Sequence, residues 1–130
     1  KRLLGEDFRP IMEFMPLGDY NALIASCSCA MMNYHRQQGS CSIGTLLLSG
    51  SRVYMNPVNP LYQFFHARGA VFESIERLDT PWEGMFDKVS EAKRAINEKV
   101  LRDFWEIDRV DSYFRDFIID VRRLLDRRAG

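Results

Sequence analysis

Apolar residues recur at helical spacing through residues 20–38, and neither proline nor glycine interrupts them. Asp19 suits the N-cap position and Gly39 the position after the last helical turn, so the pattern predicts one helix between them. Few strongly polar residues fall in this stretch, which indicates a helix buried on most sides. Residues 1–18 contain two prolines, so we expect an irregular arm there. Its apolar side chains are predicted to dock on the rest of the domain: Phe8, Ile11, Phe14 and Met15.

Two short apolar runs come next, at residues 45–48 and 52–55. They are separated by Ser-Gly-Ser, and the glycine can adopt a positive φ in a tight turn. This spacing predicts a β-hairpin with a three-residue loop. An isolated hairpin is marginal in water, so we expect it to pack on the helices or to extend the sheet of a partner.

A junction at residues 56–61 separates the predicted hairpin from further helices. Asn59 can cap a helix, and Pro60 suits its first position. We therefore expect a short helix over 61–68 and a second over 70–78, with a strand at 70–73 as the weaker alternative. We interpret the junction as structural and expect no ligand to bind there.

The C-terminal third has the longest periodic pattern of the chain. Thr80, Pro81 and Glu83 form a capping box that predicts a helix start. From there an apolar stripe continues at three- and four-residue steps, which either one helix of about 45 residues or two helices bent near 103–109 would satisfy. Its C-terminal members are Phe104, Ile107, Val110, Phe114, Phe117, Val121 and Leu124.

These elements predict an α+β fold that is mainly α. It consists of a buried N-terminal helix, a small hairpin, two short helices and a long C-terminal helical arm. The 130 residues fit one domain, and because the first residue is Lys1 we expect a fragment of a longer protein. The expected divisions are the arm at 1–18, the α/β core at 19–79 and the helical arm at 80–128.

Composition narrows the function classes. The 18 basic and 18 acidic residues balance, which disfavours a strongly basic, polyanion-binding protein. No apolar run approaches the length of a membrane helix, so we expect no membrane partner. Three cysteines make a disulfide scaffold unlikely and favour a reducing, intracellular compartment, cytoplasmic or nuclear.

Four residues match the ligand types of a structural zinc site: Cys27, Cys29, His35 and Cys41. Their spacing argues against zinc, because positions 27 and 29 of a helix point to different sides. We therefore predict no metal and no disulfide, with a small zinc- or thiol-dependent protein kept as an alternative.

Catalytic signatures are weak throughout the chain. There is no phosphate-binding glycine motif, and nothing in the sequence marks Cys41 as an activated nucleophile. His35 and His66 are the only histidines, and neither has an evident nucleophile beside it. We expect no enzyme activity and no cofactor.

The aromatic C-terminal arm favours a noncatalytic protein–protein interaction or assembly module, an adaptor whose simplest partner is a second copy. Phe104–Trp105 and Ile118–Ile119 are adjacent pairs, so one member of each is predicted to lie off the main stripe. The main stripe, Phe114 included, is expected to face the domain or the helix beside it, and substituting Phe114 is expected to damage the fold. The partner-binding candidates are Phe104, Trp105, Tyr113, Phe117, Ile118 and Leu125.

The main alternative is a nucleic-acid-binding module that uses the terminal basic cluster. This cluster consists of Arg122, Arg123, Arg127 and Arg128. Arginines in the last turns of a helix also interact favourably with its dipole, which explains them without a nucleic acid.

Overall fold

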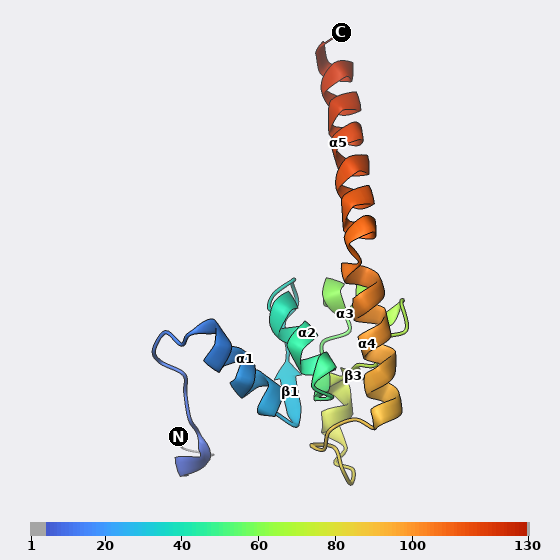
Figure 1. Ribbon diagram of the computed structural model, residues 1–130. Coiled ribbons are helices and arrows are strands. Elements are labelled where there is room, and N and C mark those ends of the chain that lie inside the picture. Colours follow the sequence, from blue (N-terminus) through green and yellow to red (C-terminus); the bar gives the residue numbers. More distant parts are fainter. Residues whose placement is uncertain (1–4, 130) are drawn as a thin grey trace.

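The computed structural model describes residues 5–129, and the side chains of residues 6, 128 and 129 lie outside that description. Helices pack beside one small sheet, and the last helix continues away from the other elements (Figure 1). The predicted α+β, mainly α, class is confirmed. The helices are α1 (Leu17–Ser26), α2 (Ser40–Leu48), α3 (Pro60–His66), α4 (Glu91–Trp105) and α5 (Ile107–Ala129). The strands are β1 (Cys29–Met32), β2 (Arg52–Met55) and β3 (Glu73–Ser74), and two 3-10 turns are η1 (Gly5–Asp7) and η2 (Ile75–Asp79).

The sheet is parallel, with the order β1-β2-β3. Cys29 lies opposite Arg52 in the register, and Tyr54 lies opposite Glu73. Parallel neighbours need a crossover connection, which α2 supplies between the first two strands and α3 between the second and third. The predicted hairpin is therefore wrong in its first strand, because residues 45–48 belong to α2. Its predicted second strand, residues 52–55, is β2.

Residues 45–48 are helical because their apolar side chains meet the core on one helix face. Ile43, Leu46 and Leu47 are buried, which is the i, i+3, i+4 pattern of a helix. Gly50 ends α2 with φ 76°, and the Ser51 N–H donates to the Leu46 carbonyl at 2.9 Å. The glycine interpreted as a hairpin turn is thus the C-terminal stop of a helix.

The single helix predicted between Asp19 and Gly39 is also wrong. Pro16, rather than Asp19, is the N-cap of α1, and the helix ends at Ser26 with Cys27 extended. The chain then forms β1, because pairing with β2 outweighs the helical spacing of its residues. Gly39 has φ 67° and precedes α2 instead of ending a helix.

One face of the sheet carries the hydrophobic core. Val53 and Met55 of β2 are almost completely buried against side chains from α2, α3 and α4. Phe104 of α4 meets Phe64 and Phe65 edge to face, with ring centroids 5.2 and 5.3 Å apart. These contacts fix α3 and α4 on the same side of the sheet as the core.

The other face is covered by residues 80–89, an irregular segment instead of the predicted helix start. The Tyr54 hydroxyl donates to the Met85 carbonyl at 2.6 Å, and Arg52 Nε donates to the Asp87 carbonyl at 3.1 Å. Arg52 also pairs with buried Glu73 at 3.1 Å. These contacts hold the segment across the sheet, so the capping box at Thr80 starts no helix.

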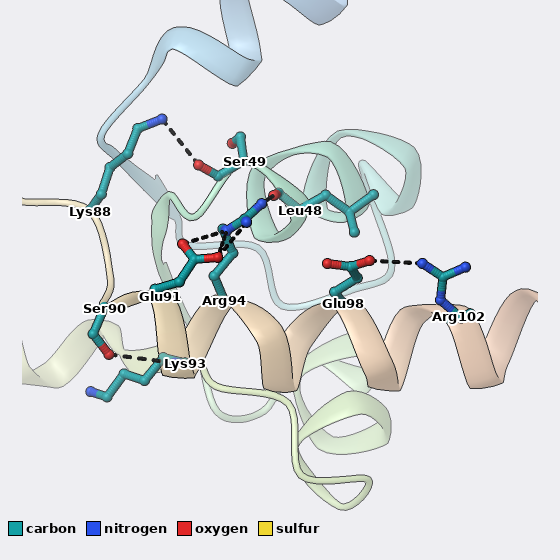
Figure 2. Close-up of polar contacts among 9 residues, drawn as sticks. All are labelled: Leu48, Ser49, Lys88, Ser90, Glu91, Lys93, Arg94, Glu98 and Arg102. Atoms are coloured by element: carbon teal, nitrogen blue, oxygen red, sulfur yellow. Dashed lines mark hydrogen bonds and ion pairs between the residues drawn. The ribbon is translucent and has the colours of Figure 1, made fainter.

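Helix α4 begins ten residues later, where the Ser90 hydroxyl accepts from the backbone of Lys93. Figure 2 shows how α4 and the segment before it contact the end of α2: Arg94 Nη1 of α4 donates to the Leu48 carbonyl at 3.4 Å, and Lys88 Nζ of the preceding segment donates to the Ser49 carbonyl at 3.0 Å. The last carbonyls of a helix have no partner within it, so these two cations supply donors that α2 lacks.

The junction at residues 56–61 has the structure that the sequence predicts. Asn59 Oδ1 accepts from the Leu61 N–H at 2.8 Å, and Pro60 occupies the first position of α3. The helix predicted over 70–78 is wrong in its first half, because β3 occupies residues 73–74 and only η2 is helical. Pairing with β2 again decides the local structure.

The N-terminal arm does not pack as predicted within its described part, residues 5–16; residues 1–4 lie outside that part. Phe14 is 96% exposed, and Phe8, Ile11 and Met12 are also exposed. Only Met15 among the predicted docking residues is half-buried.

Among the described residues, no helix is both long and apolar enough to cross a bilayer.

Candidate functional site

Helix α5 is a separate helix that follows a sharp break in the chain. Glu106 has φ −59° and ψ 125°, which ends α4 after Trp105. Its carbonyl accepts from the N–H groups of Arg109 and Val110, both at 3.0 Å, and so starts α5. Of the two arrangements predicted for the arm, the structure has two helices with the break at residue 106.

The apolar side chains of α5 form one continuous surface, which we call the α5 stripe. At 100° per residue they span about 140° of the helix circumference, which is the width of a core-facing surface. Most of this surface is uncovered: Phe114 is 67% exposed, Phe117 62% and Leu124 60%. The α5 stripe consists of Ile107, Val110, Tyr113, Phe114, Phe117, Ile118, Val121, Leu124 and Leu125.

The spacing within the α5 stripe is that of a coiled-coil seam. Alternating steps of three and four residues connect Ile107, Val110, Phe114, Phe117, Val121 and Leu124. Ile118, Leu125 and Tyr113 widen the seam on its two sides. Up to residue 127, the last described side chain, the rest of the circumference is charged or polar except for Ile119, so this part of α5 has one apolar face.

One member of the Ile118–Ile119 pair lies off the α5 stripe, as the sequence predicts. Ile118 belongs to the same stripe as Phe117, and only Ile119 lies off it. The prediction that the stripe faces the domain is wrong along α5, because Phe114 and its neighbours are exposed. The sequence pattern identified the apolar face but not what lies against it.

The predicted partner-binding residues fall into two groups. Phe104 is half-buried against Phe64 and Phe65, so it helps to hold α4 on the core. The other five are exposed: Trp105, Tyr113, Phe117, Ile118 and Leu125. Trp105 lies at the base of α5, with its ring centroid 4.9 Å from that of Phe104.

The basic cluster predicted for nucleic acid lies in the last turns of α5. Arg122, Arg123 and Arg127 are exposed, and Arg123 pairs with Asp120 at 3.4 Å. The side chain of Arg128 lies outside the described part. Asp120 and Asp126 lie within the same turns, so the positive charge there is partly neutralised.

The zinc argument assumed one helix for Cys27, Cys29 and His35, but the structure places each of them in a different segment, with His35 in the loop after β1. Cys27 follows α1, Cys29 lies in β1 and Cys41 lies in the first turn of α2. Across residues 5–129, the structure gathers no three His, Cys, Asp or Glu side chains that could hold a metal ion. Burial raises the pKa of the Cys29 thiol, against the opposing effect of Arg52, and a raised pKa disfavours the reactive thiolate.

The carboxyl edge of the parallel sheet is a candidate site that the sequence analysis did not identify. In α/β folds, ligands bind outside the carboxyl ends of parallel strands. Here the loop of residues 33–39 follows β1, and Asn59 organises it by donating to the Tyr34 carbonyl at 2.9 Å and the Arg36 carbonyl at 3.0 Å. His35 and Arg36 are exposed in this loop. The signal in the sequence was the alternation of short apolar runs with capped helices over 29–74, which is typical of β-α-β units.

A hollow of about 630 Å³ opens beside this edge, between α1, β1 and α2. Its wall is mostly apolar, with Ile24, Ala30 and Leu46 among the lining residues. Tyr34 and Gln38 place polar groups in the same wall. An apolar hollow with a few polar groups can bind a small molecule.

Comparison with protein-family models, with curated proteins and with solved structures finds no match to this chain, so its functional proposal rests on the geometry described above.

Proposed function

We propose that this chain is a noncatalytic protein–protein interaction module and that the α5 stripe is its contact surface. The observation that carries the proposal is that most of this stripe is uncovered by the described chain, although α5 runs for 23 residues. Large apolar side chains each contribute about 1.5–3 kcal/mol when they leave water. An exposed surface of this kind is typical of an interface.

The simplest partner is a second copy of the chain, and α5 can supply the same surface from both copies. Interface energy concentrates in a few large anchors, and the α5 stripe contains two phenylalanines near its middle, Phe114 and Phe117. Trp105, which is 60% exposed, lies at the base of the same helix. Association through α5 would leave the sheet and its core unchanged.

Two adjacent isoleucines provide a matched test. Ile118 lies in the α5 stripe and Ile119 lies on the charged face, and they are 40% and 41% exposed. We expect Ile118→Asp to abolish self-association in sedimentation equilibrium, whereas Ile119→Asp should retain it. Both variants should keep the helical circular-dichroism signal of the parent protein measured as a monomer. A wild-type chain that stays monomeric at every concentration would overturn the proposal.

A second candidate function is the binding of a small anionic ligand at the carboxyl edge of the sheet. It is favoured by the parallel strand order and by the exposed His35 and Arg36 in the loop after β1. Titration with inorganic pyrophosphate, followed by calorimetry, tests it. Arg36→Gln should weaken binding, whereas Arg68→Gln, at the far end of α3, should not. Equal binding by both variants would exclude the loop of residues 33–39 as the site.

A further inference from the structure

The charges of α5 are distributed unevenly along its length. Residues 106–116 carry four carboxylates and two arginines, whereas residues 117–128 carry four arginines and two carboxylates. The two halves therefore have opposite net charges. A second α5 lying parallel would place like charges side by side, whereas an antiparallel one would place the negative half of each helix beside the positive half of the other.

The apolar seam fits the antiparallel orientation as well. When the helix is reversed about its middle, Ile107 meets Leu124 of the second copy, Val110 meets Val121, and Phe114 meets Phe117. Every layer of the seam is then apolar on both sides. The two phenylalanines of each copy form the two central layers, where the interface is best shielded from water.

The residues that flank the seam distinguish the two orientations. In an antiparallel pair, Glu106 at the start of α5 lies beside Arg127 of the second copy, and twofold symmetry forms this contact twice. In a parallel pair, Glu106 lies beside Asp111 instead, and two carboxylates repel. Glu106 and Arg127 are both exposed, so their side chains are free to make such a contact.

We infer that two copies of this chain associate through α5 in the antiparallel orientation. This inference rests on the proposed interaction role of the α5 stripe and adds the identity of the partner surface and its direction. At either end of the pair, Leu125 of one copy reaches the Phe104–Trp105 side chains of the other. Trp105 therefore reports the pairing through its fluorescence.

A charge exchange tests the orientation. Glu106→Arg and Arg127→Glu each convert both flanking contacts of a homodimer from attraction to repulsion. We expect each variant alone to self-associate about tenfold more weakly than the wild type, as for several exposed ion pairs. An equimolar mixture of the two variants restores both attractive contacts, so it should form a heterodimer about as tightly as the wild type. Sedimentation equilibrium measures the dissociation constants of the two variant homodimers and of the heterodimer.

The matched control uses the outer face of α5. Asp108→Arg and Arg123→Glu change the same charges near the same helix ends but lie away from the seam. Mixing them should give no tighter association than either alone. If the mixture of Glu106→Arg and Arg127→Glu also associates no more tightly than either variant alone, the antiparallel pairing is wrong. The proposed interaction role is tested separately. It requires that the wild type self-associates and that Ile118→Asp abolishes this self-association.

Discussion

Helices α4 and α5 are consecutive in the chain, and each has an apolar face, but only α4 lies against other elements along its length. α4 buries Leu101 and Asn97 and contacts α2. α5 has the longer and more continuous apolar face, and its large apolar side chains are exposed. The helix with the weaker pattern is thus the one that the core holds.

The reason lies in what each helix is attached to. α4 is held by specific polar contacts as well as by packing: Asn97 Oδ1 accepts from the Val71 N–H at 2.6 Å, and Arg94 reaches the end of α2. α5 begins beyond Glu106, where the backbone turns out of the α4 helix. Periodicity along a sequence therefore identifies an apolar face but does not identify the surface that covers it.

We expect the two helices to differ most in how much free energy of unfolding is lost when a leucine is replaced by alanine. Leu101→Ala should lower the free energy of unfolding by about 2–5 kcal/mol, because it leaves a cavity in the core. Leu124→Ala, on α5, should change it by no more than about 0.5 kcal/mol. Urea denaturation followed by circular dichroism, at a concentration where the protein is monomeric, measures both. Equal losses would show that α5 is folded against the rest of the chain.

The next largest effect concerns the loop at the carboxyl edge of the sheet. Asn59→Ala removes the cap of α3 and leaves the carbonyls of Tyr34 and Arg36 without their donor. We expect a loss of about 3 kcal/mol in the free energy of unfolding, more than the ~1 kcal/mol of an ordinary cap. Pro60→Ala should cost little, because proline at the first helical position is replaceable. A loss of only about 1 kcal/mol for Asn59→Ala would mean that the loop is not held by this side chain.

The sequence predicted the local elements that depend on local signals, and it failed where pairing between distant residues decides. The cap at Asn59 follows from nearby residues and was predicted, whereas a break near residues 103–109 was one of two arrangements that the sequence left open. β1 was interpreted as helix because Cys27, Met31 and Tyr34 have helical spacing, and only its partner β2 makes it a strand. The carboxyl-edge candidate was missed because of the same error, since a hairpin and a parallel β-α-β unit place their loops differently. Six of the nine residues of the α5 stripe were predicted from their spacing, but the width of the stripe and its exposure were not.

A smaller effect is expected from Tyr54, whose hydroxyl is buried on the second face of the sheet. Burial raises the pKa of Tyr54, with Arg52 opposing the rise. The unfolded chain therefore ionises first, near pH 10, and stability should fall above about pH 10 by at most about 1.4 kcal/mol per pH unit. Tyr54→Phe should remove this dependence and cost about 1 kcal/mol near neutral pH, because the hydrogen bond to Met85 is lost. Urea midpoints at about pH 8 and about pH 11 test it; an unchanged alkaline loss in Tyr54→Phe would assign it to another group.

The smallest effect on stability is expected at the largest exposed side chains of the arm. Phe114→Ser should change the free energy of unfolding of the monomer by no more than about 0.5 kcal/mol, because Phe114 is 67% exposed. The same substitution should prevent self-association, since Phe114 lies in a central layer of the proposed antiparallel pair. Phe65→Ser, within the core, should instead unfold the protein, because Phe65 packs against Phe64, Phe72 and Phe104. Thermal unfolding monitored at the monomer concentration, together with sedimentation of the same samples, separates the two outcomes. A Phe114→Ser variant that loses its fold would mean that the α5 stripe is covered within a single copy of the chain, and the division between α4 and α5 would then disappear.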